Sequence, residues 1–282
     1  EYIGKIYTIM HPEIKLIAID LDGTLLNSQG RVSERNAAAI QAACAQGIMV
    51  ILATGKSRAS ATAVITELNL NTPGVFSQGS MIHNADGSLR YARIMARETA
   101  VTTLNFAQTH NLTQIVYCPN GIVTNQDTVY RHLLASQYHE PLPEVIGPLL
   151  PQLDNLSINK IILCAADNEI TLAEQLQAKL GSTGEVTQAV SHYIEILPAN
   201  TSKGDGLQRL LAELEIPPEN VLAIGDGNND IEMLQMVGIA VAMENGSTDV
   251  KAVAHSITAD NNHDGVAQAI EQFIRKRPQI RS

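Results

Sequence analysis

The chain has 282 residues, 45% of them hydrophobic, and its 19 basic and 29 acidic residues give a net charge of −10. This length and apolar content are sufficient for two hydrophobic cores, so we expect two domains. The acidic balance repels nucleic acid and offers it no basic surface, which argues against a nucleic-acid partner and means that an anionic substrate needs local cations. Because no run of about eighteen apolar residues occurs, we expect no membrane span and no membrane partner.

The start of the chain and its cysteines favour an intracellular protein. Residues 1–9 lack the charged start and apolar centre of a signal peptide, and we interpret them as an extension or a remnant of cloning. Cys44, Cys118 and Cys164 lie far apart, which fits a reducing compartment and argues against a zinc cluster. We expect all three to be buried, and the protein to be a soluble, cytoplasmic monomer or weak homo-oligomer.

Strand-like runs alternate with helical patterns in the first part of the chain. We expect a strand ending at Asp20, a helix from about Ser33, a strand over residues 48–53 and a helix to Leu68. Repeated strand–helix–strand units are typical of a parallel sheet covered by helices. This part of the chain therefore predicts a Rossmann-like α/β fold.

The pattern changes from residue 84 onward. Residues 84–88 predict a hairpin turn, residues 156–165 predict a long strand, and the proline-rich residues 141–151 predict a connection. We interpret residues 84–198 as an inserted α+β domain.

The alternation of helix and strand returns after this insert. We expect a helix after Ser202, a strand over residues 221–224, a helix over residues 230–237 and a strand over residues 239–242. These elements are expected to share one parallel sheet with the first part of the chain, in a three-layer α/β core. The two halves of this discontinuous core cover residues 10–83 and 199–282.

The first buried strand ends in a pair of carboxylates, Asp20 and Asp22. Ligands bind beyond the carboxyl ends of parallel strands, and side chains two residues apart on an extended segment point the same way. We therefore assign Asp20 to nucleophilic attack at phosphorus and Asp22 to general acid/base work. The alternative is that Asp22 and Gly23 form a tight hairpin turn, which we disfavour because the residues that follow are expected to become helical.

A second acidic group follows the strand over residues 221–224. Mg²⁺ prefers hard oxygen ligands and usually takes few carboxylates together with water and substrate phosphate, a pattern that Asp20 and Asp226 fit. Asp230 lies in the first turn of a predicted helix. It either caps that helix or orients a metal-bound water or a catalytic lysine, and the sequence leaves both interpretations open.

Two further positions supply hydrogen-bond donors and a cation. The strand over residues 48–53 ends in Thr54 and Gly55, whose hydroxyl and amides are suited to cradle phosphate oxygens, although they also suit a plain helix cap. Lys203 stands at the start of a predicted helix, where it either neutralises phosphate charge or is an ordinary surface lysine.

Two other phosphate- or metal-binding motifs can be tested by counting residues. A P-loop requires glycine five residues before Gly55, where Val50 stands. Residues 260–271 do match the calcium-loop pattern, but residues 256–258 predict a short strand where that motif needs a helix. We therefore discount calcium binding and interpret this stretch as a polar loop in which Asp264 caps the last helix.

Taken in order, the motifs resemble those of the haloacid dehalogenase superfamily of phosphohydrolases. The motifs are Asp20-x-Asp22-Gly23-Thr24, Thr54-Gly55, Lys203 and Gly225-Asp226-Gly227-x-x-Asp230. Because the insert lies after the second motif and before the lysine, the chain looks like the Cof-type subfamily, whose α+β (C2B-type) cap covers a Rossmann-like core. The resemblance spans residues 15–275.

The resemblance implies a role for each matching residue, and a Mg²⁺ cofactor. It implies Asp20 as nucleophile and Asp22 as general acid/base, with Thr54 and Lys203 orienting the nucleophile and the phosphate. The implied metal-site residues are Asp20, Asp226, Asp22 through its main-chain carbonyl, and Asp230 in a supporting role. The expected substrate-binding residues are Gly23, Thr54, Gly55, Lys203 and Asn229.

The sequence departs from the family pattern at three places. Lys56 stands where relatives commonly have arginine, which keeps the charge but loses a bidentate fork. Gln78 and Gly79 stand in place of the usual Asn-Gly at the entry to the cap, and Asn200 and Thr201 replace a Gly-Val pair near the lysine. These departures bear on substrate contacts and on hinge motion more than on chemistry.

We expect a Mg²⁺-dependent phosphatase that acts on a small phosphorylated metabolite, with a sugar phosphate favoured, through an aspartyl-phosphate. One alternative is a phosphomutase that returns the phosphoryl group to a sugar. The other is a catalytically silent binding or regulatory protein of the same fold, which the complete set of motif residues disfavours.

Overall fold

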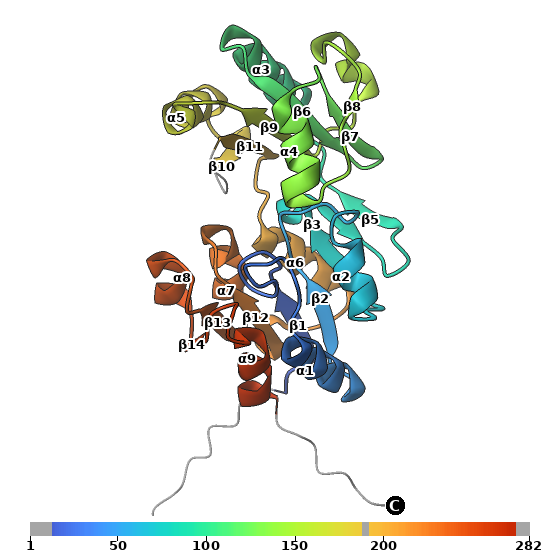
Figure 1. Cartoon of the computed structure of the whole chain (residues 1–282), viewed down its shortest axis with the longest axis vertical. Coiled ribbons are helices and arrows are strands. Elements are labelled where there is room, and N and C mark those ends of the chain that lie inside the picture. The colour runs from blue at the N-terminus through green and yellow to red at the C-terminus, as the bar shows by residue number, and fades with distance from the viewer. Residues whose placement is uncertain (1–12, 188–191, 275–282) are drawn as a thin grey trace, which may run out of the picture.

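A computed structural model describes residues 13–187 and 192–274 of the chain. Figure 1 shows two lobes stacked along the long axis, a parallel sheet with its helices below and a mixed sheet with its helices above. The predicted extension at residues 1–9 lies outside the described residues. The ends of the predicted core, residues 10–12 and 275–282, also lie outside them.

The lower lobe is built on a parallel sheet whose central strands are buried on both faces. In spatial order its strands are β14 (Ser256–Thr258), β13 (Ile239–Met243), β12 (Val221–Gly225), β1 (Leu16–Ile19) and β2 (Met49–Leu52). Continuous apolar runs without polar alternation are typical of strands covered on both sides. Because β1 and β12 are neighbours, their carboxyl ends lie at the same edge of the sheet.

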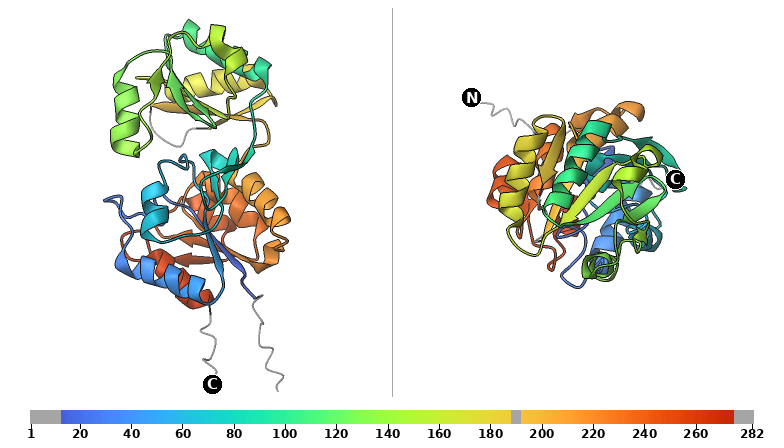
Figure 2. Two further views of the ribbon diagram at one scale, coloured as in Figure 1. Left: turned by 90° about the vertical axis from the view of Figure 1, so that its right-hand side faces the viewer. Right: turned by 90° about the horizontal axis from the view of Figure 1, so that it is seen from above.

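Helices cover both faces of this sheet, as the side view in Figure 2 shows. One face is covered by α1 (Glu34–Ala45), α2 (Thr62–Glu67) and α9 (Gly265–Phe273), and the other by α6 (Lys203–Glu213), α7 (Ile231–Met236) and α8 (Thr248–Val253). Alternate residues of β1 reach opposite layers: Ile17 and Ile19 join the first group, whereas Leu16 and Ala18 join the second. The predicted three-layer α/β core is confirmed.

The predicted start of the first helix is also confirmed. Ser33 precedes α1, and its hydroxyl accepts a hydrogen bond from the backbone N of Asn36 (3.1 Å). The residues after Gly23 do not become helical at once, because residues 21–32 form turns in which Leu26 bridges to both Asp22 and Val32. We disfavoured a turn at Asp22 and Gly23 because we expected a helix directly after them, and that expectation was wrong. The turn does not, however, join two strands of a hairpin.

A small antiparallel sheet follows at the junction of the lobes. Its strands are β3 (Gly74–Phe76), β4 (Met81–His83) and β5 (Leu89–Ala92). The backbone N of Asn84 donates to the carbonyl of Ser88 (2.9 Å), which confirms the predicted hairpin. β3 also bridges to the core at Ala53. The predicted domain boundary at residue 84 stays a prediction, and this hairpin runs across it.

The upper lobe contains a mixed sheet. In spatial order its strands are β10 (Gly184–Thr187), β11 (Tyr193–Pro198), β9 (Lys160–Cys164), β6 (Thr113–Cys118), β7 (Gly121–Thr124) and β8 (Glu144–Val145). Helices α3 (Arg97–Thr109) and α5 (Glu169–Leu180) pack on one face, and α4 (Val129–Tyr138) packs on part of the other. We call this lobe the cap, and its α+β composition matches the predicted insert.

Two predictions about the cap were wrong in extent. The strand expected over residues 156–165 is only β9, because a 3₁₀ turn (Leu150–Asn155) precedes it and the register with β6 ends at Lys160. The proline-rich connection over residues 141–151 contains β8, which pairs in parallel with β7. Short 3₁₀ turns elsewhere are Ser77–Gly79, Pro218–Asn220 and Asn228–Asp230.

Predictions about the cysteines and the calcium-like loop have mixed outcomes. Cys118 and Cys164 are buried as expected, but Cys44 is exposed, so that prediction was wrong for the outer side of α1. The short strand predicted over residues 256–258 is confirmed as β14. Glu271, the twelfth position of the calcium pattern, lies on α9 and pairs with Arg35 (2.7 Å) rather than facing the loop.

Asp264 occupies the N-cap position of α9 in a left-handed conformation (φ 59°), but within the described structure its side chain makes no capping hydrogen bond. The predicted capping role was thus right in position and wrong in contact. Among the described residues, no helix combines the length and the apolar character needed to cross a bilayer.

Candidate active site

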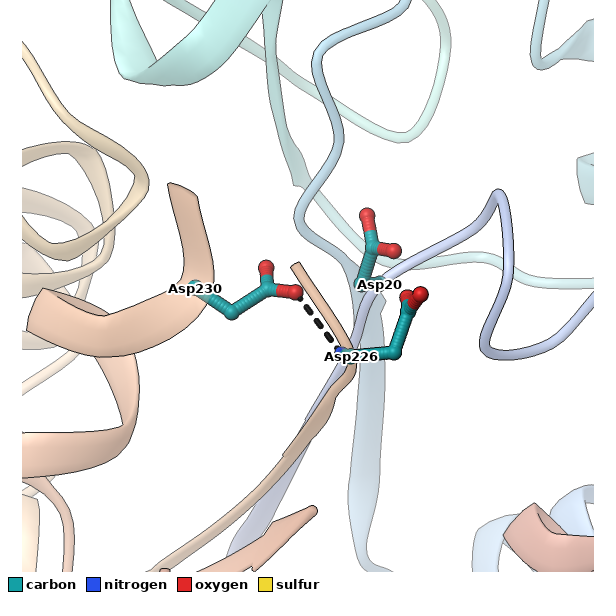
Figure 3. Close-up of side chains that lie close together, drawn as sticks. All are labelled: Asp20, Asp226 and Asp230. Atoms are coloured by element: carbon teal, nitrogen blue, oxygen red, sulfur yellow. Dashed lines mark hydrogen bonds between the residues drawn. The ribbon is translucent and has the colours of Figure 1, made fainter. Parts of the chain in front are cut away.

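Three carboxylates converge at the carboxyl edge of the core sheet. Asp20 follows β1, Asp226 follows β12, and Asp230 ends the 3₁₀ turn that comes next. One oxygen from each lies within 4.8 Å of the others, and Figure 3 shows the three side chains around one point. The parallel pairing of β1 with β12 causes this approach, and the backbone N of Asp20 donates to the carbonyl of Ile224 (3.0 Å). The predicted convergence of Asp20 and Asp226 is confirmed.

A buried lysine bridges two of these carboxylates. Lys203 is the first residue of α6, and the hydroxyl of Ser202 caps that helix by accepting from the backbone N of Asp205 (3.1 Å). Its Nζ donates to Oδ1 of Asp20 (2.6 Å) and to Oδ1 of Asp230 (2.7 Å). Burial by itself lowers the pKa of Lys203, but the two carboxylates outweigh it and raise the pKa above its ordinary value. Lys203 is therefore not an ordinary surface lysine.

The site carries more negative charge than this one ammonium balances. Burial raises the pKa of Asp20 well above its usual range; Lys203 opposes this effect, and the neighbouring Asp230 and Asp226 add to it. Burial also raises the pKa of Asp226, against a hydrogen bond from Thr24 that lowers it. Carboxylates that resist ionisation together are suited to a divalent cation, which would relieve their repulsion.

Asp230 orients Lys203, as one of the two interpretations has it, whereas its capping contact lies in the 3₁₀ turn before α7 and its side chain does not cap α7 itself. Its Oδ2 accepts from the backbone N of Asp226 (3.0 Å) and of Gly227 (2.9 Å), which fixes the loop after β12. Its Oδ1 holds Lys203. Gly225 permits this packing, because a Cβ there would lie 2.5 Å from Cγ of Asp230. Asp230 is thus well supplied with donors from the protein itself.

The loop after β1 shapes the space around Asp226. The hydroxyl of Thr24 donates to Oδ1 of Asp226 (2.8 Å), a contact that the motif did not reveal. Gly23 has φ +81°, and a Cβ there would lie 2.4 Å from Oδ2 of Asp226, so only glycine fits. The carboxylate oxygens of Asp20 and Asp226 keep lone pairs with which they can bind a cation. Hard oxygen ligands of this kind fit Mg²⁺.

Asp22 and Thr54 lie on the same cavity as Asp20. The side chain of Asp22 is 55% exposed, and its Oδ1 forms an ion pair with Nζ of Lys56 (2.9 Å). Thr54 is buried, and its Oγ1 accepts from the backbone N of Lys56 (3.1 Å), so it shapes the turn that carries this lysine. Lys56, the departure from the family arginine, therefore has an identified partner.

The cavity has a volume of about 290 Å³ and lies between the core and the cap. Asp20, Asp22 and Lys203 are at its core side. The cap contributes residues that the sequence analysis did not single out. They are Tyr117, Tyr138, Glu140, Lys160, Tyr193 and Glu195. The available signal in the sequence was a charged residue within or at the start of an apolar run, Glu195 in the first case and Lys160 in the second.

Gln78 connects the core site to the cap. Nδ2 of Asn229 donates to its Oε1 (3.0 Å), and its Nε2 donates to Oε2 of Glu195 (3.3 Å). The backbone of Gln78 is left-handed (φ 58°). Its side chain packs closely against Gly55, since a Cβ on residue 55 would lie only 2.7 Å from Nε2 of Gln78. Asn229 and Gly55, both predicted to bind substrate, thus lie at the cavity and in contact with this glutamine.

A second cavity of about 530 Å³ lies on the other side of Gln78 and Lys203, toward Glu232 and Asn200. Neither Asp20 nor Asp226 is among the described residues that line this second cavity. Lys203 lines both cavities, and the smaller one is the one that contains the reactive carboxylates Asp20 and Asp226.

Comparison with known proteins identifies the family. Residues 17–270 match the model of the haloacid dehalogenase-like hydrolases. Phosphatase YwpJ of Bacillus subtilis (strain 168) is 31% identical over 287 residues, which cover 93% of this chain and 100% of YwpJ. A crystal structure of a haloacid dehalogenase-like hydrolase from Bacteroides thetaiotaomicron, 29% identical, superimposes with a TM-score of 0.82 over 92% of this chain and 99% of that one.

A longer plant relative is also similar. The chloroplastic endoribonuclease YBEY of Arabidopsis thaliana is 34% identical over 273 residues, which cover 93% of this chain but only 47% of that protein. This chain thus spans about half the length of the plant protein. The chain belongs to the haloacid dehalogenase-like hydrolases, and YwpJ, which it matches from end to end, is called a phosphatase.

Proposed function

We propose that this chain is a phosphatase that hydrolyses a small phosphorylated metabolite, with Mg²⁺ as cofactor and an aspartyl-phosphate intermediate. The observation that carries the proposal is the bridge of Lys203 between Asp20 and Asp230, with Asp226 alongside, on the wall of a cavity that core and cap residues line together. One carboxylate in this cluster is placed to attack and the ammonium is placed to offset charge on phosphate oxygens.

Asp20 and Asp226 would hold the Mg²⁺ ion, with the main-chain carbonyl of Asp22 as a further ligand and Asp230 as the residue that keeps the loop in place. When bound, the ion supplies positive charge that offsets both the carboxylates and the phosphoryl group. Thr24 supports this arrangement by holding one oxygen of Asp226.

In the proposed reaction, one oxygen of Asp20 attacks phosphorus while the bond between phosphorus and the leaving oxygen breaks. Asp22 donates a proton to that leaving oxygen, which departs as an alcohol. Asp22 then takes a proton from water, the water oxygen attacks phosphorus, and the bond to Asp20 breaks. Inorganic phosphate leaves and Asp20 is restored. Lys203 and Thr54 orient the nucleophile and the transferred oxygens.

A sugar phosphate is the favoured substrate class. The cavity is at the small end of the range for ligand sites, about 300–1,000 Å³, which favours a small metabolite over a nucleic acid. The cytoplasmic location, the monomeric or weakly oligomeric state and the absence of a membrane or nucleic-acid partner remain predictions from sequence.

A phosphate-release screen tests the proposal. The panel contains sugar phosphates, nucleotides and phosphorylated cofactors, each with Mg²⁺ and with a chelator. We expect Mg²⁺-dependent release that Asp20→Asn reduces by about a thousandfold or more, whereas Glu174→Gln, exposed on α5, leaves it unchanged. No release across the panel would favour the binding protein, and transfer to an added sugar in place of release would favour the mutase. Full activity of Asp20→Asn would refute the assigned nucleophile.

A further inference from the structure

The wall of the cavity opposite the carboxylates is one face of the cap sheet. Side chains alternate along a strand, so Tyr117 on β6, Lys160 on β9, and Tyr193 and Glu195 on β11 all emerge on the face that carries α4. The other face is covered by α3 and α5. These four side chains all line the cavity that contains Asp20. They are therefore placed to contact the part of a substrate that remains after the phosphoryl group is removed.

The central feature of this wall is a buried ion pair. Lys160 and Glu195 are only 2% and 8% exposed. Nζ of Lys160 donates to Oε1 of Glu195 (3.4 Å) and to the carbonyl of Gly55 (3.1 Å), and it lies 4.2 Å from the ring centre of Tyr117. Glu195 also accepts from Gln78. The positive charge of Lys160 is thus balanced before any ligand binds.

The other charges around the cavity are also committed to partners. Lys56 pairs with Asp22, and Lys203 is held between carboxylates at the reactive end. Glu140 accepts hydrogen bonds from the backbone N of Ser57 (2.9 Å) and from its hydroxyl. Among the described residues that line the cavity, every ammonium has a carboxylate partner. A second anionic group on a substrate would therefore meet no unpaired cation, and burying an unpaired charge is costly.

The same wall offers hydroxyl groups instead. Among the described residues, no hydrogen bond uses the phenol hydroxyls of Tyr117, Tyr138 or Tyr193, although all three side chains line the cavity. Burial raises the pKa of each phenol, most clearly that of Tyr117, so the hydroxyls stay protonated and can donate. Their rings present apolar faces beside these polar ends. Such a surface suits a carbon skeleton that carries hydroxyl groups.

We propose, on the basis of the phosphatase function above, that this wall selects an uncharged, hydroxyl-rich leaving group, and that the pair Lys160–Glu195 sets this charge preference. The substrate class is the monophosphate of a polyol or sugar. Bisphosphates and phosphorylated sugar acids are disfavoured, because their second anionic group faces a wall whose cation, Lys160, is already neutralised by Glu195.

Two substrates that differ by one charge test the proposal. Sorbitol 6-phosphate and 6-phosphogluconate share a six-carbon chain and differ at the far end, CH₂OH against carboxylate. We expect the wild-type kcat/KM to be higher for sorbitol 6-phosphate by about tenfold or more. Glu195→Gln keeps the shape but leaves the ammonium of Lys160 without its carboxylate, so this ratio should fall by about tenfold. The matched control Glu174→Gln should keep the wild-type ratio.

Each outcome distinguishes the inference from the proposed function. Equal hydrolysis of both esters by the wild type, or an unchanged ratio in a folded Glu195→Gln, overturns the charge selection while the phosphatase function stands. No hydrolysis of any phosphomonoester refutes the function itself. Should Glu195→Gln fail to fold by circular dichroism, Tyr193→Phe replaces it. That variant should raise KM for sorbitol 6-phosphate more than KM for ethyl phosphate, and an equal change in both would overturn the proposal.

Discussion

The bridge made by Lys203 permits a quantitative test of the site. In Lys203→Met the side-chain length is nearly kept, but the ammonium that lies 2.6 Å from Asp20 and 2.7 Å from Asp230 is lost. Lys203 is 1% exposed, so water cannot replace it readily. Removing one partner from a buried ionic cluster costs about 3–5 kcal/mol of unfolding free energy, because the remaining charges stay buried and uncompensated.

The same change should reduce catalysis. An ammonium aimed at developing negative charge is comparable to one donor of an oxyanion hole, whose removal costs about 100- to 1,000-fold in kcat, or about 2.7–4 kcal/mol. Unfolding is measured with urea in the presence of a chelator, and kcat by phosphate release at saturating Mg²⁺. Lys179→Met, an exposed position on α5, is the control and should change the unfolding free energy by no more than about 0.5 kcal/mol.

The pH dependence of the stability loss gives a second check. Burial raises the pKa of Asp20 and Lys203 opposes that rise, so without the lysine the pKa rises further. A carboxylate whose folded-state pKa is raised keeps its stabilising effect below the unfolded-state pKa and loses it as pH rises. The deficit of Lys203→Met should therefore grow as the pH rises above the ordinary pKa range of an aspartate. If the unfolding free energy of Lys203→Met lies within about 1 kcal/mol of the wild-type value at the higher pH, the ionic bridge does not stabilise the site as argued.

Three further tests concern the glycine turn, the metal site and the tyrosines. Gly79 has φ +92°, and a Cβ on this residue would lie 1.9 Å from the carbonyl oxygen of Ser202. Gly79→Ala should therefore lower the unfolding free energy measured with urea by more than about 2 kcal/mol. A loss below about 0.5 kcal/mol would contradict this reasoning. Thr24→Val removes the donor to Asp226 and should raise the Mg²⁺ concentration for half-maximal activity by about tenfold or more; an unchanged Mg²⁺ titration would disprove that support. Because burial raises the pKa of Tyr117, phenolate absorbance of the native protein should lag behind that of the unfolded protein above about pH 10, and stability should fall over the same range. Coincident titrations would speak against buried, protonated phenols.

The position of the reactive groups could be predicted because it depends on a simple rule of sheet geometry. Asp20 and Asp226 follow apolar runs, and parallel strands in one sheet bring their carboxyl ends to one edge. The prediction required only that these two strands belong to the same parallel sheet. The bridge by Lys203 is different: its role was implied by family resemblance, because residue type and spacing alone allow an ordinary surface lysine.

The errors have local causes that tertiary structure decides. Apolar content over residues 156–165 predicted a long strand, but pairing with β6 ends at Lys160, and unpaired residues are not sheet whatever their propensity. Helix α2 begins only at Thr62, and in the turn before it the backbone N and the hydroxyl of Ser57 donate to Glu140 of the cap. Neither the missing partner strand nor the distant carboxylate is visible in the local sequence.

The residues that would read the leaving group were hidden for a related reason. Glu195 interrupts the apolar strand β11 and Lys160 begins the apolar strand β9, and a buried charge in such a strand needs a partner. The sequence does not say which. Only the antiparallel register, in which Glu195 pairs with Ile162 two residues beyond Lys160, puts the two charges on one face and lets them neutralise each other. The proposed charge selection therefore depends on the pairing of the cap strands, which a motif search confined to the core does not reveal.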